Sequence, residues 1–503
     1  MHPRNPYQNP PDFQQLADAY PPLKPYLVYS YHGVTIDFMD ESAQRSDSSQ
    51  MGCRVLIYPP YSIIETQNRR LTEALLYRDF QVTINIPEDR ICPPVPNRLN
   101  YILWLQDVVD ATAIAEPTDS ERKISGIDMS FYNLSSSGLP FSPSLDFCCN
   151  WSVVTHRGLA SLSFTSSLLS GNRLFNPDVD EKSLESARFN VRRNNLDDRI
   201  TVVKSKPSGS MLLHLFESNS DGASTSNGVH FDFTMCNPPF YRNREEILRS
   251  AEAKEFGPAA VCTGADVEMI APGGEVSFVG RMVQESVEIR TKCRWYTSML
   301  GKLSSLTEIV TLLRVHHVDN YACTEFVQGR TRRWAIAWSF GDVRLPDCLA
   351  RISSTEAQNL MPARNTLRQS YPQAKSLVHL ASVVTAICAL LHDISVRSPL
   401  PGEQCAGAGL EIIIAAPRDT WSRAARRKKA HGITMQTEPD SSAEPILVCR
   451  IVCVEEGDNR MREESASGSI KLRFDWMKGR DRSLYESFTS HVGRKVAAAL
   501  GAC

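Results

Sequence analysis

A short apolar run that stops at two prolines constrains this chain more than any other stretch. Residues Val229 to Cys236 are mostly apolar, with one acidic residue among them, as is typical of a buried parallel strand. Asn237-Pro238-Pro239 follows at once, and the two prolines forbid further strand pairing and impose a rigid, extended turn. Because open α/β sheets bind ligands at the carboxyl ends of their strands, this turn is the first candidate for a site.

The residue types of the turn suit one kind of chemistry. Asn-Pro-Pro followed by an aromatic residue is typical of methyltransferases that act on exocyclic amino groups of bases or of glutamine. An adenine amino group is a poor nucleophile, and the Asn237 side-chain oxygen and the Pro238 carbonyl can each accept one of its N–H groups. Pro239 stiffens the backbone that holds this carbonyl, and Phe240 or Tyr241 can stack on an extruded base. The alternative is an ordinary Asn-Pro turn after a core strand.

Composition excludes several classes of protein. The chain has 503 residues with 42% hydrophobic content and a formal net charge of -2, so it is long enough for two domains, and any nucleic-acid surface must be a local patch. Its 14 cysteines include no Cys-x-x-Cys pair, which argues against a zinc site and for a reducing compartment. We expect no metal, no signal peptide and no membrane span, and a location in the nucleus, the cytoplasm or both.

Two acidic residues are candidates for binding a nucleoside cofactor, and Asn237 is a further candidate contact to it. Asp128 lies in Lys123–Met129, which resembles the first strand of a nucleotide-binding α/β domain. Asp178 closes a second strand before a helix over Glu181–Asn194, and its alternative role is a helix N-cap. A glycine-rich turn should follow the first strand, but the residues from Ser130 to about Asn176 are rich in Ser, Phe and Leu and show no clear periodicity.

Basic side chains supply the remaining candidates. Arg98 stands at the start of a predicted helix that prolines precede, and its planar guanidinium suits a carboxylate. Judged by itself, an arginine in this position would more often be a surface residue. Candidate RNA contacts are Arg4, Lys302, Arg330, Arg332 and Arg333 in the first part of the chain, and Arg426, Arg427, Lys428 and Lys429 in the last part. The alternatives are a packed N-terminal arm, a solvated hairpin tip over Glu325–Phe340 and a nuclear-import signal at Arg426–Lys429.

The chain divides into three successive segments. We expect one domain over 1–345, a linker over 346–372 and a small α+β module over 373–503. Within the first domain, Leu71–Phe80 predicts a short helix, while Ser46–Asn68 fits neither neighbouring element. In the module, Ile446–Val452 and Ile470–Trp476 predict paired strands and Leu484–Leu500 a terminal helix.

These stretches together resemble the methyltransferase-like protein 16 family of RNA adenine-N(6) methyltransferases, which act on U6 spliceosomal RNA. The resemblance rests on His2–Phe13, Asp79–Trp104, Asp178–Lys204, Phe231–Tyr241, Gly273–Lys302 and Thr324–Phe340, and in the module on Trp421–Lys429 and Phe474–Val496. It implies a Rossmann-like α/β domain dependent on S-adenosylmethionine, an α+β RNA-binding module and a structured RNA hairpin as substrate. Arg98 then matches the cofactor-carboxylate arginine, Asp178 the ribose acid and Asn237 the catalytic asparagine.

Two departures from the family pattern matter. Ser130 stands where the first glycine of a Gly-Thr-Gly turn belongs, and Ser46–Asn68 has no family counterpart. We therefore expect weak binding of the cofactor. The alternatives to an RNA adenine-N(6) methyltransferase are a ribosomal RNA adenine or protein glutamine methyltransferase, and a catalytically silent RNA-binding protein that has lost the cofactor turn.

Overall fold

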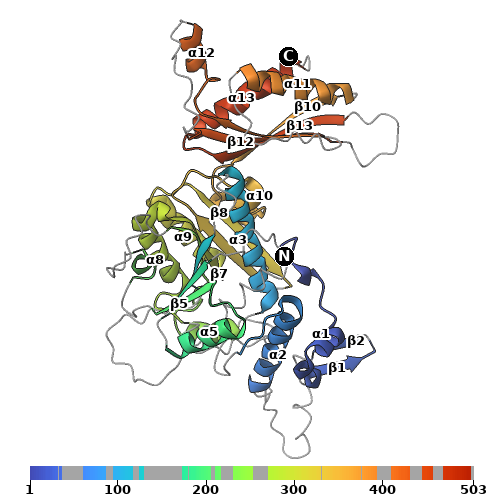
Figure 1. Cartoon of the computed structure of the whole chain (residues 1–503), viewed down its shortest axis with the longest axis vertical. Coiled ribbons are helices and arrows are strands. Elements are labelled where there is room, and N and C mark those ends of the chain that lie inside the picture. Colours follow the sequence, from blue (N-terminus) through green and yellow to red (C-terminus); the bar gives the residue numbers. More distant parts are fainter. Residues whose placement is uncertain are drawn as a thin grey trace, which may run out of the picture. The chain divides into compact units, whose positions relative to one another are not determined.

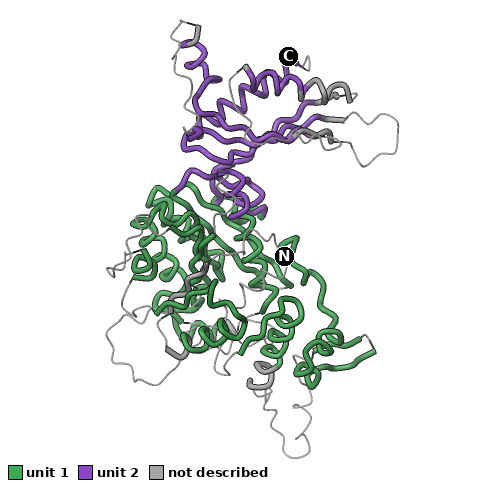
Figure 2. Tube along the Cα trace, in the orientation of Figure 1, with its two compact units in different colours: residues 1–107, 121–340, 354–360 green, residues 108–120, 341–353, 361–503 purple. Residues whose placement is uncertain are grey.

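The computed structural model divides into two compact units (Figures 1 and 2). Unit 1 comprises residues 1–107, 121–340 and 354–360, and unit 2 comprises 108–120, 341–353 and 361–503. The structure describes residues 1–31, 33–36, 61–85, 94–116, 124–129, 173–178, 181–204, 210–216, 230–252, 270–329, 331–374, 377–393, 409–430, 444–456 and 468–499.

Unit 1 is built on a seven-stranded mixed sheet, which confirms the predicted α/β class. In sheet order its strands are β5 (Ile200–Lys204), β4 (Arg173–Asp178), β3 (Ser125–Asp128), β6 (Phe231–Met235), β7 (Cys293–Leu300), β9 (Thr331–Trp338) and β8 (Tyr321–Gln328). The first five run parallel, and β9 pairs antiparallel with both β7 and β8. The order reverses between β3 and β6, where an open α/β sheet binds its ligand.

Helices cover both faces of this sheet. Tyr296 of β7 stacks on Trp338 of β9, and the Trp338 indole donates to Ser286 of helix α8 (Gly274–Ile289) at 2.9 Å. The next residue, Thr297, hydrogen-bonds Tyr101 of helix α3 (Val95–Ala115) on the other side. Since neighbouring residues of a strand point to opposite faces, α8 and α3 lie on opposite sides of the sheet.

The N-terminal residues form a separate small cluster on α3. Helix α2 (Tyr61–Phe80) packs with α1 (Phe13–Ala19) and the hairpin of β1 (Leu27–Ser30) and β2 (Gly33–Ile36) around a core of buried apolar residues. The arm before α1 is fixed to α3, because Asn5 donates to the Pro96 carbonyl at 2.9 Å and to Asn100 at 2.8 Å. Further helices of unit 1 are α5 (Glu181–Arg193), α6 (Arg244–Glu252) and α9 (Leu303–Val315).

Unit 2 is the predicted α+β module and has its own four-stranded antiparallel sheet. In sheet order the strands are β10 (Thr366–Ala374), β13 (Gly468–Lys478), β12 (Leu447–Glu456) and β11 (Gly409–Ala416), and the helices are α10 (Asp347–Ala350), α11 (Leu377–Asp393), α12 (Arg423–Ala430) and α13 (Arg482–Ala499). Its apolar core contains paired aromatic rings: Trp476 stacks on Tyr485, and Phe488 meets Trp421 edge to face.

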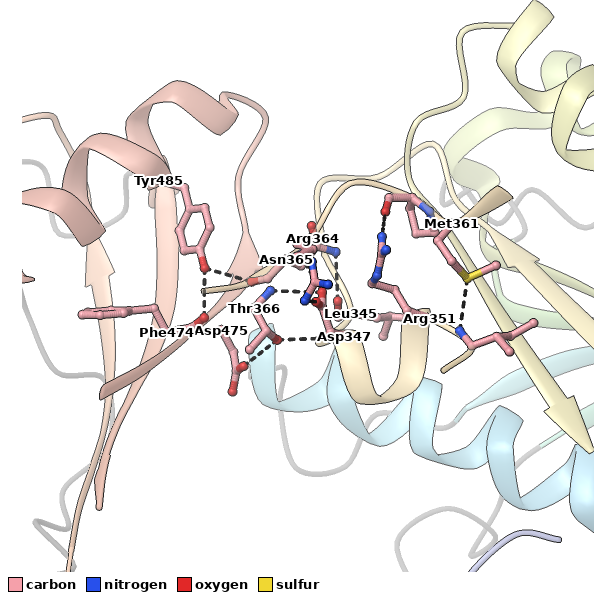
Figure 3. A network of polar contacts seen from close by, with 12 residues as sticks. Leu345, Asp347, Arg351, Met361, Arg364, Asn365, Thr366, Phe474, Asp475 and Tyr485 are labelled. Atoms are coloured by element: carbon pink, nitrogen blue, oxygen red, sulfur yellow. Dashed lines mark hydrogen bonds and ion pairs between the residues drawn. The ribbon is translucent and has the colours of Figure 1, made fainter. Parts of the chain in front are cut away.

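Polar contacts fasten the stretch before β10 to the sheet of unit 2 (Figure 3). Asp347 accepts the backbone N–H groups of Asn365 at 2.8 Å and Thr366 at 3.1 Å, and the Thr366 hydroxyl donates to Asp475 of β13 at 2.8 Å. The Tyr485 hydroxyl lies 2.9 Å from the carbonyl of Asn365. The interval that the sequence suggests as a linker, 346–372, therefore holds α10, a 3-10 helix at Thr355–Leu360 and the start of β10.

The structure corrects two expectations about elements. Helix α2 begins at Tyr61, so 61–68 belong to a helix, although Ser46–Asn68 seemed to fit neither neighbour; 46–60 lie outside the described residues. Strand β4 begins at Arg173, inside the stretch without clear periodicity, whose residues 130–172 lie outside the described ones. The division of the chain into a methyltransferase domain, a linker and an RNA-binding module stays a prediction.

Candidate functional site

The carboxyl ends of β3 and β6 lie side by side in register, with Asp128 next to Met235. The Met129 N–H donates to the Met235 carbonyl at 2.8 Å, and the Met299 N–H of β7 donates to the Cys236 carbonyl at 2.8 Å. Backbone bonds from both neighbouring strands thus hold the last residues before Asn237. This fixes the start of the Asn237 turn at the point where the strand order reverses.

A buried chain of hydrogen bonds fixes the same point from helix α3. The Cys236 N–H donates to the Tyr101 hydroxyl at 3.2 Å, and the Thr297 hydroxyl donates to the Thr234 carbonyl at 2.6 Å. Since the Thr297 proton is used there, Tyr101 donates to Thr297 across their 2.5 Å contact. Burial raises the pKa of the Tyr101 phenol well above its usual range, so the donor stays protonated.

The Asn237 side chain offers an unused acceptor. Its Oδ1 atom is buried and has no hydrogen-bond partner among the described residues. A buried acceptor left in this state costs about 1–3 kcal/mol. Such an atom suits a ligand that brings an N–H group. Pro238 and Pro239, also buried, follow it in the rigid turn.

Arg98 and Asp128 lie close enough to interact electrostatically. Burial lowers the pKa of the Arg98 guanidinium to about 10, an effect that Asp128 opposes and Arg333 reinforces. The group therefore stays charged at neutral pH. It also donates to the Met299 sulfur at 3.4 Å, beside the residues that hold Cys236. The predicted cofactor residues Arg98 and Asp128 thus gather at the same strand ends as Asn237.

Asp178 is the last residue of β4, the strand next to β3. This agrees with the expected position at the end of a second strand, and α5 begins three residues later at Glu181. The structure does not describe the Asp178 side chain, so its binding role stays a prediction.

The Phe240 ring has a glycine and an arginine as close neighbours. A Cβ atom at Gly301 would lie 2.9 Å from Cδ1 of the Phe240 ring, so only glycine fits there without displacing the ring. The Arg333 guanidinium lies over the same ring, with Cζ 5.4 Å from its centroid, in a cation–π arrangement. The sequence predicted Phe240 and Arg333 as separate contacts, and the structure brings them together.

The other basic candidates have acidic neighbours. Arg4 is ion-paired with Asp107 of α3 and donates to the Leu103 carbonyl at 3.3 Å. Lys302 is ion-paired with Glu246, and Arg332 lies 3.5 Å from Glu325. Arg330 lies outside the described residues. In unit 2 the side chains of Arg426, Arg427 and Lys428 are exposed on α12, while that of Lys429 is not described.

Two residues that shape the site escaped the sequence analysis. Tyr101 stands in an apolar, aromatic helix and resembles a core residue. Glu275, only 2% exposed, accepts the N–H groups of Gly301 at 2.6 Å and Lys302 at 3.1 Å. Its one signal in the sequence is an acidic residue directly after the two glycines Gly273 and Gly274.

The described part of the chain holds neither a metal-binding cluster nor a membrane-spanning helix. No group of three or more His, Cys, Asp or Glu residues there could hold a metal ion. No described helix is both long and apolar enough to cross a membrane.

The chain is similar to known RNA methyltransferases. A family model described as RNA methyltransferase matches residues 65–131 and 165–342. The human RNA N(6)-adenosine-methyltransferase METTL16 is 29% identical over 89% of this chain and 71% of its own length. The U6 small nuclear RNA (adenine-(43)-N(6))-methyltransferase of Schizosaccharomyces pombe is 29% identical over 85% of this chain and 92% of its own.

A solved structure is similar as well. The catalytic domain of human METTL16, in complex with hairpin 6 of the MAT2A 3′ untranslated region, is 32% identical. The match covers 68% of this chain and 98% of that one, with a TM-score of 0.50.

Proposed function

The chain belongs to the METTL16 family of S-adenosylmethionine-dependent RNA N(6)-adenosine methyltransferases, and we propose that its Asn237 turn receives the target adenine of a structured RNA hairpin. The observation that carries this assignment is the buried, unpartnered Oδ1 of Asn237 among the described residues. It lies at the end of β6, where the strand order reverses. An adenine amino group supplies the N–H donor that this atom lacks.

The residues at the strand ends fit the methyl donor. We assign Arg98 to the donor's carboxylate, because a charged guanidinium in a partly desolvated position suits that group. Asp178, at the end of β4, is assigned to the ribose hydroxyls, and Asp128 is assigned to the same cofactor site. When bound, S-adenosylmethionine supplies an electrophilic methyl group on a sulfonium.

The chain's own residues orient the nucleophile. Asn237 Oδ1 and the Pro238 carbonyl accept the two N–H groups of the adenine, which aims the nitrogen lone pair at the methyl carbon. Phe240 stacks on the base. Transfer would form the N–C bond as the donor's C–S bond breaks, and the methylated nitrogen would then be acidic enough to release its proton to water, so no strong base is needed. Burial raises the pKa of Cys236 far above neutrality, and this neighbouring thiol stays uncharged and takes no nucleophilic part.

We assign RNA contacts outside the adenine pocket to the basic residues Arg4, Lys302, Arg330, Arg332, Arg333 and Arg426 to Lys429. The logarithm of RNA affinity falls linearly with the logarithm of salt concentration, and each lost phosphate contact should reduce the magnitude of this slope by about one. Measuring this slope for Arg332→Ala and for Arg426→Ala on one hairpin tests each unit separately. A slope equal to that of the unmodified chain would show that the replaced residue does not contact RNA phosphates.

The relative from Schizosaccharomyces pombe is named for U6 small nuclear RNA. We propose a hairpin of this type as substrate of the present chain, and the nucleus as its place of action.

Replacing Asn237 tests the assignment. Asn237→Ala should reduce methyl transfer to RNA by about 100- to 1,000-fold, the usual effect of losing a pre-organised polar group in an active site. Binding of the cofactor and of the hairpin, each measured by titration, should stay within about threefold of the unmodified chain. Asn359→Ala, at an exposed position, is the matched control. Full transfer by Asn237→Ala would contradict the assignment.

A further inference from the structure

The contacts around Phe240 extend to a buried carboxylate that the reaction itself does not use. Glu275 lies in the first turn of α8, after Gly273 and Gly274, whose φ angles of +80° and +70° favour glycine. Its two carboxylate oxygens accept the N–H groups of Gly301 and Lys302, which follow β7. One buried side chain therefore holds the backbone turn against which Phe240 lies.

Burying this carboxylate has a cost. Burial raises the pKa of Glu275 above its usual range, and the hydrogen bonds from Ser305, Gly301 and Lys302 only partly oppose the effect. The Lys302 ammonium group, which is ion-paired with Glu246 of α6, also opposes the effect through its charge. The ionised form of Glu275 is the one that accepts both backbone N–H groups fully. The protein therefore keeps a buried negative charge, at a cost in desolvation free energy, and this charge holds a single turn.

The turn that Glu275 fixes is in contact with the Phe240 ring. A methyl group at Gly301 would lie 2.9 Å from Cδ1 of the ring and 3.2 Å from Oε2 of Glu275. The Arg333 guanidinium also lies over the ring. Any shift of the 301–302 backbone would therefore move the surface that sets the position of the ring.

We propose that Glu275 is a positioning residue for methyl transfer: by holding the Gly301 turn, it fixes the Phe240 ring at the height at which the stacked adenine presents its amino group to Asn237. This proposal rests on the assignment of Phe240 as the stacking residue. Glu275 itself does not touch the base. Its effect on the rate passes through Gly301 and Phe240.

The test compares three variants with the unmodified full chain. Glu275→Gln keeps the shape but turns one acceptor into a donor, so one of the two backbone N–H groups loses its partner. Gly301→Ala leaves Glu275 in place and displaces the ring directly. Glu288→Gln, at an exposed position on the same helix, is the matched control and should leave kcat and Tm unchanged.

Both Glu275→Gln and Gly301→Ala should lower kcat by about 10- to 100-fold, because small misplacements of reacting groups have effects of this size. The Kd for S-adenosylmethionine should change by less than about threefold. With 2-aminopurine in place of the target adenine, the fluorescence change on binding should be altered in both variants.

Combining Glu275→Gln with Phe240→Ala distinguishes an effect on the position of the ring from a general disturbance of the structure. If Glu275 acts through the ring, the double variant Phe240→Ala/Glu275→Gln should be no slower than Phe240→Ala alone. Additive losses, or a fall of kcat matched by an equal loss of cofactor binding, would overturn the proposal. If the unmodified chain itself transferred no methyl group to RNA, the proposed function would fail instead.

Discussion

At Gly126, in β3, there is no room for any side chain. A Cβ atom there would lie 2.3 Å from the ring of Phe233 on the neighbouring strand β6. Gly126→Ala should therefore destabilise unit 1 by about 1–3 kcal/mol, the usual cost of overpacking a core. Denaturant unfolding monitored by fluorescence measures this change.

The control for this substitution lies in the same unit. A Cβ atom at Gly280, inside α8, would meet only Leu312 at an ordinary 3.6 Å. Gly280→Ala should leave stability unchanged or raise it by up to about 1 kcal/mol, because alanine favours a helix over glycine. Equal losses in both variants would show that the contact with Phe233 is not the cause.

Tyr101 connects helix α3 to the end of β6 through its hydroxyl alone. Tyr101→Phe keeps the ring and leaves the Cys236 N–H and the Thr297 hydroxyl without this partner. We expect a loss of about 1–3 kcal/mol in stability and a lower kcat, since the Asn237 turn begins one residue later. Calorimetry and steady-state kinetics measure the two effects, and an unchanged kcat would separate Tyr101 from the site.

Single residues differ in how far the sequence reveals them. The positions of Asn237 at a strand end and of Arg98 at a helix start could be predicted because prolines mark both locally, while their roles in the site stay predictions. Glu275 and Tyr101 could not, because their roles depend on partners that lie far away along the chain, at Gly301 and Cys236. The stacking of Arg333 on Phe240 likewise depends on how β9 lies relative to the Asn237 turn.

On the scale of elements, α12 and α13 make the stability of unit 2 depend on pH. His491 of α13 is buried, and burial lowers its pKa, with Arg426, Lys495 and Arg494 acting in the same direction. Below about pH 6.5 the unfolded chain therefore takes up a proton that the folded chain resists. The stability of unit 2 should fall as the pH drops from 7 toward 5.

Urea unfolding at several pH values, compared between the unmodified chain and His491→Gln, measures this contribution. The stability difference between the two proteins should change with pH below 6.5, as the lowered pKa implies. A constant difference from pH 7 to 5 would contradict the expected role of His491.

Several regular elements of the chain could be predicted because their periodicity is local. The helix over Glu181–Asn194 is confirmed by α5, and the paired strands of the module by β12 and β13. The sequence did not reveal α10 and β10 as regular elements. Their structure depends on contacts among Asp347, Thr366 and Asp475, which come together only in the folded unit. No local sequence pattern predicts such a network of hydrogen bonds.

On the scale of the whole molecule, activity depends on how well the segment after β3 binds the cofactor. The family model leaves residues 132–164 between its two matched segments, and Ser130 stands next to that interval. We predict that the unmodified chain binds S-adenosylmethionine weakly and that Ser130→Gly tightens binding, since glycine lets the backbone approach the cofactor. Isothermal titration measures both Kd values. An ordinary micromolar Kd for the unmodified chain would refute the expectation.

The atom that receives the methyl group distinguishes the proposed function from its alternatives. The most direct test is incubation of the full chain with S-adenosylmethionine and a U6-type RNA hairpin, followed by mass spectrometry of the digested nucleosides. We predict N(6)-methyladenosine from the unmodified chain and essentially none from Asn237→Ala. A methyl group on another atom, or no product although hairpin and cofactor are both bound, would contradict it.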